Sequence, residues 1–273
     1  MSLPGPKIVG GPYVMGVLNV TPDSFSDGGK WMGSDAVARA LEMVEAGADL
    51  IDIGGESTRP GAEPVSEQEE IDRVAPVIRA LRAKTDAVIS IDTMKPAVAL
   101  AAFAAGAKIW NDVLALRAPG AQEAAAALKA PLILMHMRGE PRTMQNDPVY
   151  DDVVAEVIAF LRARAREAEQ RGLTDVWVDP GIGFGKTLAH NLALLNAIGR
   201  IRDEVGRPVV FGASRKSFIA KIDANAKDAE TGRLGGSIAA ALLAAQNGAA
   251  MLRVHDVVET VQALKMWCAA GAA

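Results

Sequence analysis

Short apolar runs alternate with longer segments of helical periodicity along the whole chain. The apolar runs lack clean polar alternation, which is typical of parallel strands buried on both faces. Each is followed by a segment whose apolar residues recur at helical spacing, so the pattern indicates repeated strand–helix units. The predicted strands are Val14–Asn19, Leu50–Gly54, Val88–Asp92, Lys108–Asp112, Pro131–His136, Val176–Asp179, Val209–Gly212 and Met251–His255.

The helical segments carry local start and stop signals. We expect Ser34 to cap a helix that ends at Gly47, and Ser66 to open the next helix in a capping box with Glu69. Pro96 suits the first turn of the third helix. The later helices are expected at Gln122–Leu128, Val149–Arg171, Leu188–Ile198, Arg215–Ile222, Leu234–Asn247 (after a polar break) and Val257–Ala270.

Eight strand–helix units in 273 residues predict an α/β fold, a (β/α)8 TIM barrel that forms a single domain over residues 1–273. An open, doubly wound sheet is the alternative. We favour the barrel because the units number eight and because no dinucleotide fingerprint follows the first strand. The strands of such a barrel are parallel, so their C-terminal ends lie on one face, where barrel enzymes build their sites.

Composition narrows the class of protein. The net charge is −4, from 29 basic and 33 acidic residues, which disfavours a nucleic acid or an anionic membrane as partner. The single Cys268 excludes an internal disulfide framework and a cysteine zinc site, and it fits the reducing cytoplasm. We find no signal-peptide pattern and no apolar run of the roughly 18 residues that a membrane helix needs.

Polar side chains stand at the ends of all the predicted strands. Strand-terminating caps account for one or two of them, whereas their recurrence predicts one shared ligand site on the C-terminal face. The loops Val20–Gly33 and Gly54–Val65 are long and polar, and each is a candidate lid or an ordinary mobile loop. The strand-end residues are Asn19, Gly54–Arg59, Asp92, Asn111 with Asp112, His136, Asp179, Lys216 (four residues on), and Arg253 with His255.

The turn Asp179–Lys186 places a carboxylate before three glycines and a lysine, between a strand and a helix. Glycines in such a turn let backbone N–H groups approach a ligand closely. The turn is not a P-loop, because Pro180 stands where that motif has glycine. It is not a dinucleotide fingerprint either, because Lys186 replaces the third glycine. A tight turn with a solvated Asp179 is the structural alternative.

One group of strand-end residues suits an anion. Arg253 and His255 alternate along the last strand and therefore point to the same side. The first and last strands of a barrel are neighbours, so Asn19 joins them in a clamp suited to diphosphate oxygens. The neutral oxygen of Asn19 can also ligate Mg²⁺, which is usually held by few protein groups together with phosphates.

A second group consists of hydrogen-bond acceptors. Asp92, Asn111 and Asp179 face inward at strand ends, where a carboxylate is costly unless something donates to it. A flat heterocycle with several N–H groups, such as a pterin or guanine, would satisfy all three. Ion pairing is the alternative, and the nearby cations are Lys186, Arg215 and Lys216.

Long motifs cover nearly the whole chain: Gly16–Gly29, Asp52–Gly61, Ser90–Thr93, Trp110–Asp112, Met135–Gly139, Thr143–Gln145, Asp179–Lys186, Ser214–Ile219 and Arg253–Asp256. In their order and spacing the chain resembles the dihydropteroate synthases. The resemblance implies a cytoplasmic, homodimeric, Mg²⁺-dependent transferase of folate biosynthesis that sulfonamides inhibit. Such an enzyme joins 7,8-dihydropterin-6-ylmethyl diphosphate to 4-aminobenzoate and releases 7,8-dihydropteroate and diphosphate.

The resemblance also implies a role for each matching residue. Those that hold or line the pterin are Asp92, Asn111, Asp179, Lys216, Met135, Phe184 and Gly212. Those that hold the diphosphate are Asn19, Arg253 and His255, with Asn19 also the metal ligand. Those that surround the aminobenzoate are Phe25, Thr58, Arg59, Pro60, Lys216 and Ser217.

The implied mechanism needs no side-chain nucleophile. The diphosphate leaves first, the remaining pterin methylene cation is stabilised by charge, and the neutral amine then attacks. The implied catalytic residues are Asp92, Lys216, Arg253 and His255. The run Val113–Pro119 departs from the family, because it lacks the small acidic turn expected there.

Two other functions stay open. A domain that passes a methyl group from a folate to a corrinoid shares the barrel and the pterin carboxylates, although it needs no diphosphate clamp. A non-catalytic homologue would bind the pterin diphosphate without making product.

Overall fold

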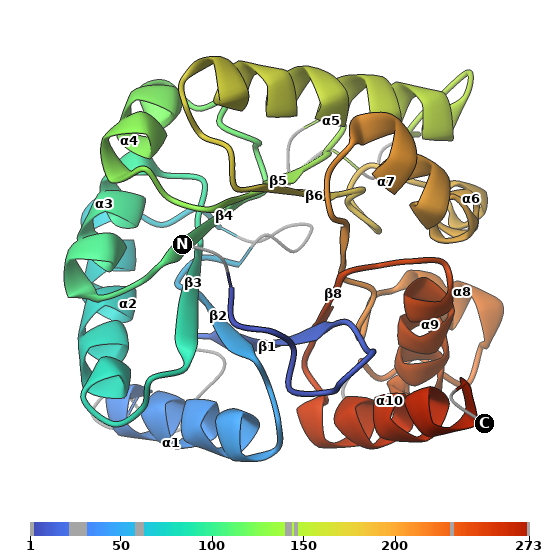
Figure 1. Ribbon diagram of the computed structural model, residues 1–273, viewed down its shortest axis with the longest axis horizontal. Helices are drawn as coiled ribbons and strands as arrows, with labels where there is room; N and C mark the ends of the chain where they lie inside the picture. Colours follow the sequence, from blue (N-terminus) through green and yellow to red (C-terminus); the bar gives the residue numbers. More distant parts are fainter. Residues whose placement is uncertain are drawn as a thin grey trace.

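The computed structural model is a ring of parallel strands surrounded by helices (Figure 1). It describes residues 3–21, 32–57, 63–139, 144, 147–229 and 232–271. The strands are β1 (Tyr13–Asn19), β2 (Leu50–Gly54), β3 (Val88–Asp92), β4 (Ile109–Asp112), β5 (Leu132–Met135), β6 (Val176–Asp179), β7 (Val210–Phe211) and β8 (Met251–Val254). Three have the predicted bounds, and the others differ by one residue at one or both ends.

The strand order confirms the barrel and excludes the open, doubly wound sheet. Hydrogen-bonded neighbours follow the order β6-β5-β4-β3-β2-β1-β8-β7, and all the pairs are parallel. The ring closes between β6 and β7 through a parallel bridge of Val178 with Val209. There the Val178 N–H donates to the Pro208 carbonyl at 3.0 Å. Closure brings the C-terminal ends of all the strands to one face of the barrel.

Each strand is followed by at least one helix on the outside of the ring. The helices are α1 (Met32–Glu45), α2 (Glu67–Arg82), α3 (Pro96–Ala105), α4 (Ala121–Leu128), α5 (Val153–Gln170), α6 (Leu188–Asn196), α7 (Ile198–Val205), α8 (Phe218–Ile222), α9 (Leu234–Gln246) and α10 (Val257–Gly271). Helix α7 was not predicted. Among these described helices, none is long and apolar enough to cross a membrane.

Several predicted helix starts are wrong in detail. Helix α1 begins before Ser34, so Ser34 lies inside it and is not its cap. Only half of the capping box at α2 forms, because Ser66 accepts from the Glu69 N–H at 3.2 Å while the Glu69 carboxylate pairs with Arg73. Helix α5 begins later than predicted because Asp152 caps it, accepting from two N–H groups of the first turn. Pro96 opens α3 as expected.

The inside of the barrel is layered. Its lower layer is apolar and contains Met15, Leu50, Ile109, Ile133, Val210 and Met251. Side chains alternate along a strand, so the residues two positions further on also face inward, one layer nearer the C-terminal face. Three of these next residues are Asp52, Asn111 and Arg253. The apolar layer therefore supports a polar one directly above it.

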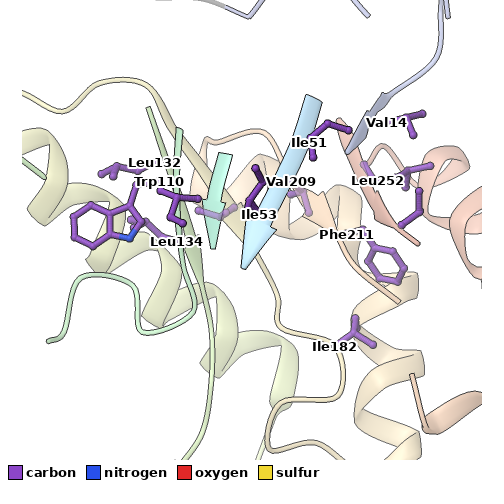
Figure 2. Close-up of a cluster of buried hydrophobic side chains, with 14 of the residues drawn as sticks. Val14, Ile51, Ile53, Trp110, Leu132, Leu134, Ile182, Val209, Phe211 and Leu252 are labelled. Atoms are coloured by element: carbon purple, nitrogen blue, oxygen red, sulfur yellow. The ribbon is translucent and has the colours of Figure 1, made fainter. Parts of the chain in front are cut away.

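Outward-facing strand residues pack against the helices. In Figure 2, Ile51 and Ile53 of β2 lie in one buried cluster with Trp110, Leu132 and neighbouring strand residues. Ile51 and Ile53 flank Asp52 in sequence and face the opposite side of the strand. This packing holds β2 in place and so helps to position Asp52 inside the barrel.

Candidate active site

An ion-pair network joins four strands inside the barrel. Arg253 Nε donates to Asp52 Oδ2 at 2.7 Å, and Arg253 Nη2 donates to Asp92 Oδ2 at 2.7 Å. Asn111 Nδ2 donates to the same Asp52 oxygen at 2.9 Å. The Asp52 side chain is 0% exposed and that of Asp92 is 14% exposed. Two carboxylates share one guanidinium, so the network carries a surplus negative charge when both are ionised.

Strand register explains this convergence. Asp92 of β3 is the register partner of Gly54 on one side and of Asn111 on the other. A Cβ at Gly54 would lie 3.7 Å from the Asp92 side chain, an ordinary van der Waals contact, so the backbone of Gly54 lies directly beside that carboxylate. Gly212 lies beside Arg253 in the same way, because a Cβ there would lie 3.5 Å from Arg253 Cβ.

The environment shifts the proton affinity of Asp92. Burial raises the pKa of the Asp92 carboxyl to about 7, the Arg253 guanidinium opposes this rise, and the Asp52 carboxylate adds to it. The pKa of Arg253 is raised further above its usual range, because the two carboxylates outweigh the effect of burial. Asp92 therefore titrates near neutral pH, whereas Arg253 stays charged.

Asp179 ends β6 and interacts electrostatically with Lys216, which lies beyond β7. Asp179 Oδ1 accepts from the Gly181 N–H at 2.6 Å. Lys216 Nζ donates to the Ile182 carbonyl and lies 4.8 Å from the centre of the Phe184 ring. Burial raises the pKa of Asp179, and the Lys216 ammonium opposes it. Burial lowers the pKa of Lys216 to about 8, and Asp179 opposes that change.

The glycine-rich turn differs from the expectation in one respect. Gly181, Gly183 and Gly185 have φ values of 70°, 82° and 63°, in the left-handed region that glycine adopts without strain. The Gly181 N–H binds Asp179 and the Gly183 N–H donates to Asn191 Oδ1 at 2.8 Å. These glycines therefore shape the turn, and two of its N–H groups serve the protein itself.

Lys186 and His136 form a buried pair behind this turn. Lys186 Nζ lies 3.0 Å from His136 Nδ1 and donates to the Phe184 carbonyl at 3.0 Å. Burial lowers the pKa of Lys186 to about 7, and Asp179 opposes this. Burial lowers the pKa of His136 to about 3, and Lys186 adds to the effect. His136 is thus neutral at physiological pH, and its strand-end position serves the turn.

Two of the ion pairs considered from the sequence differ in the structure. Arg215 has a partner outside the predicted group, and Asp92 has a partner that was not among the predicted cations. Arg215 pairs with Asp256, with Nε 3.2 Å from Oδ2. Asp92 pairs with Arg253, which the sequence analysis had assigned only to the diphosphate of the substrate. Asp112, the last residue of β4, is fully buried. Its carboxylate accepts from the N–H groups of Leu114 and Leu116, so it supports the turn that follows β4.

The remaining predicted site residues lie around this centre. His255 follows β8, and its Nδ1 is 3.1 Å from Ser214 Oγ. Met135 is buried in a cluster with three other side chains, and Phe184 packs against that cluster. Asn19 ends β1 and Ser217 is exposed just before α8. Four predicted residues lie outside the described ranges, namely Phe25, Thr58, Arg59 and Pro60.

A second charged network, missed from the sequence, holds the flanks of the loop after β2. Lys95 Nζ lies 3.0 Å from Glu56 and 2.7 Å from the buried Glu70, and it donates to the Val65 carbonyl at 2.7 Å. The Val65 N–H in turn donates to Glu56 at 3.2 Å. Residues on both sides of the loop are therefore tied to α2 and to the start of α3. No local motif marks this network, because its members are far apart in sequence.

Asp52 was also missed as a site residue, although it opens a quoted motif. Asp52 stands two residues before the end of β2, so the pattern of polar strand ends does not include it. The sequence does contain a signal for Asp52. It lies two residues from both Leu50 and Gly54 and so shares their inward face, on a strand that is otherwise apolar.

Together, the closed barrel and the polar residues at its C-terminal face define a TIM-barrel protein with a candidate active site at the ends of its strands. A family model described as "Pterin binding enzyme" matches residues 15–255. The dihydropteroate synthase of Escherichia coli K12 is 48% identical over 258 residues, which cover 93% of this chain and 90% of that protein. The chain therefore belongs to the dihydropteroate synthase family of pterin-binding enzymes.

Solved structures agree with this assignment. The dihydropteroate synthase of Xanthomonas albilineans, solved with 4-aminobenzoic acid, is 51% identical with a TM-score of 0.89, over 97% of this chain and 95% of that one. A structure of the same enzyme with 7,8-dihydropteroate is 49% identical with a TM-score of 0.87, over the same shares of the two chains.

Proposed function

We propose that the chain is an active synthase, which condenses 7,8-dihydropterin-6-ylmethyl diphosphate with 4-aminobenzoate to give 7,8-dihydropteroate and diphosphate. The observation that carries the proposal is the inward-facing set of acceptors and cations at the strand ends, in a chain about half identical to an enzyme solved with dihydropteroate. Asp92, Asn111 and Asp179 are the acceptors for the pterin N–H groups, and Lys216 is the cation beside Asp179.

Diphosphate departure is assigned to the anion-binding side of the site. Arg253 Nη1 makes no hydrogen bond with any described residue, while Nε and Nη2 are held by carboxylates. The guanidinium is thus anchored on one side and offers the other to the leaving oxygens, and His255, two residues further along the chain, is the second proposed ligand. Such preorganised donors stabilise charge as it develops. Stabilisation of the cation left on the pterin methylene is assigned to the Asp92 carboxylate.

The donor set fits a magnesium ion that is bound chiefly through the substrate. Among the described residues, no cluster of three or more His, Cys, Asp or Glu side chains can hold a metal. Mg²⁺ commonly takes one or two protein oxygens and completes its shell with phosphates and water. Asn19 is the proposed protein ligand, and the ion when bound would neutralise diphosphate charge.

The finer parts of the proposal concern the second substrate and the setting. Aminobenzoate is assigned to Lys216 and Ser217 together with the predicted loop residues Phe25, Thr58, Arg59 and Pro60, and sulfonamides are expected to compete there. A homodimer in the cytoplasm is proposed on the family resemblance, and the single cysteine is compatible with that reducing compartment.

Activity is expected to follow a bell-shaped pH profile. The rate constant kcat/KM for the pterin diphosphate should rise as Asp92 loses its proton near pH 7 and fall as Lys216 loses its proton near pH 8. Stability should change in the opposite sense to activity on the acid side. The folded state keeps the Asp92 proton up to about pH 7 whereas the unfolded chain releases it near pH 4, so stability falls as pH rises through that interval.

The control for this profile is Asp112→Asn. Burial raises the pKa of Asp112 to about 6, but its carboxylate faces the backbone of the following turn. The Asp112 carboxylate contributes less than Asp52 to the raised pKa of Asp92, so the acid midpoint of activity should move only slightly, and to lower pH, in this variant. A profile that is flat between about pH 6 and pH 9 would contradict the assigned roles of Asp92 and Lys216.

The function is tested by diphosphate release from the purified chain. Pterin diphosphate and Mg²⁺ are supplied with and without 4-aminobenzoate, and both diphosphate and dihydropteroate are measured. The proposal expects dihydropteroate only when aminobenzoate is present, and expects a sulfonamide to raise the apparent KM for aminobenzoate. Pterin binding without product would identify a non-catalytic homologue. Methyl transfer from a folate to a corrinoid, without synthase activity, would identify the methyltransferase class.

A further inference from the structure

Asp52 lies one layer beneath the strand-end residues and contacts two of them. It is fully buried, with Arg253 Nε and Asn111 Nδ2 both donating to its Oδ2 atom at 2.7 and 2.9 Å. Ser90, its register partner on β3, is buried at the same depth. Asp52 thus holds one predicted diphosphate ligand and one predicted pterin ligand through a single oxygen.

The contact with Asn111 determines which end of that amide is available. An ionised carboxylate only accepts hydrogen bonds, so the Asn111 NH₂ group must point toward Asp52. The Asn111 carbonyl oxygen is then directed away from Asp52. Asn111 consequently offers an acceptor, and not a donor, to a ligand in the site. This polarity matches the N–H-bearing edge of a heterocycle.

The contact with Arg253 limits how the guanidinium can turn. Rotation about the side-chain torsions would break the bond from Nε to Asp52 or the bond from Nη2 to Asp92. Two hydrogen bonds to two different carboxylates therefore fix the plane of the Arg253 guanidinium. The orientation of the remaining Nη1 group follows from this plane, which links Asp52 to the placement of the leaving group.

Stability does not account for Asp52. Its Oδ1 atom is buried and has no hydrogen-bond partner among the described residues, and the same holds for Asp92 Oδ1 and Ser90 Oγ. Buried oxygens without partners destabilise a fold, and a buried ion pair is often no more stable than apolar residues in its place. A carboxylate kept in such a position is better explained by what it orients.

We propose that Asp52 is a positioning residue of the pterin site, an inference that rests on the proposed function. It sets the hydrogen-bonding polarity of Asn111 and the plane of the Arg253 guanidinium, and it makes no contact with the substrate itself. Its loss should therefore impair binding of the pterin and departure of diphosphate, and it should spare the affinity for aminobenzoate.

The test compares Asp52→Ala and Asp52→Asn with the matched variant Ser90→Ala. Steady-state kinetics are measured for both substrates, and binding of pterin-6-carboxylate, which cannot react, is measured by calorimetry. Asp52→Ala should lower kcat/KM for the pterin diphosphate about 100-fold, because both partners lose their anchor. Asp52→Asn keeps one oxygen for both donors, loses the charge and places an NH₂ group where the buried Oδ1 has no partner, so a loss of about tenfold is expected. Ser90→Ala should stay within about twofold of the unchanged chain.

The outcomes separate positioning from general damage. In Asp52→Ala the KM for aminobenzoate should change by less than about twofold while pterin-6-carboxylate binds at least about tenfold more weakly. Pterin binding within about twofold of the unchanged chain, or an equal loss for both substrates, would overturn the proposal. If Asp52→Ala does not fold, Asp52→Asn decides: a loss of about fivefold or more in pterin binding supports the proposal, and a smaller change overturns it. If the unchanged chain makes no dihydropteroate, the proposed function fails, but the calorimetry still tests Asp52.

Discussion

Replacing Arg253 with alanine is expected to lower kcat/KM for the pterin diphosphate about 100- to 1,000-fold, the range found when one preorganised donor to a developing anion is removed. The same change should destabilise the protein by about 3–5 kcal/mol, because Asp52 and Asp92 would stay buried without their shared cation. Activity and stability are expected to fall together, because the same guanidinium pairs with the two buried carboxylates and is the group proposed to bind the leaving diphosphate.

The two effects can be separated by adding a second change. In the Arg253→Ala background, Asp52→Asn removes one of the uncompensated carboxylates, so part of the lost stability should return while activity stays low. Unfolding in urea gives the stability of each variant, and diphosphate release gives its activity. The exposed Arg39, which pairs only with Glu42 among the described residues, is the matched control, and Arg39→Ala should change neither quantity measurably. Near-normal turnover in Arg253→Ala would remove Arg253 from the diphosphate site.

Gly181→Ala should be among the most destabilising single substitutions in the barrel. A Cβ at Gly181 would lie 1.9 Å from the His136 carbonyl oxygen, which is backbone and cannot swing away. The φ of 70° adds roughly 1–2 kcal/mol of left-handed strain for a residue with a side chain. With overpacking of about 1–3 kcal/mol, the expected destabilisation is about 2–5 kcal/mol. Pterin binding should weaken as well, since the Gly181 N–H holds Asp179.

Gly120→Ala isolates the conformational part of this effect. Gly120 has a similar φ of 77°, but a Cβ there would meet nothing within 4 Å. Its destabilisation should therefore be only the strain of about 1–2 kcal/mol, with normal activity. Urea unfolding of the two variants side by side measures the difference. Equal losses of stability would mean that the turn after β6 shifts to admit the methyl group, and the assigned rigidity of that turn would be wrong.

Local signals in the sequence were sufficient for the framework and for the gathering of polar strand-end residues on one face of the barrel. Strand side chains repeat with a period of two, so apolar runs located the strands within about one residue of their observed ends. Parallel strands in a closed barrel end on one face, so polar residues at those ends, such as Asp92, Asn111 and Asp179, were bound to lie together. Helix starts were less reliable, because Ser34 lies inside α1 and the Glu69 carboxylate pairs with Arg73 and does not complete the capping box.

The sequence by itself therefore determined the barrel, the face that carries the site and the chemical character of the residues on it. Only the tertiary structure decided which of those residues bind one another. Arg253 pairs with Asp52 and Asp92 across 201 and 161 residues of chain, and Lys186 contacts His136 across 50 residues. Such contacts depend on strand register and on closure of the ring, and no local pattern of apolar and polar positions contains that information.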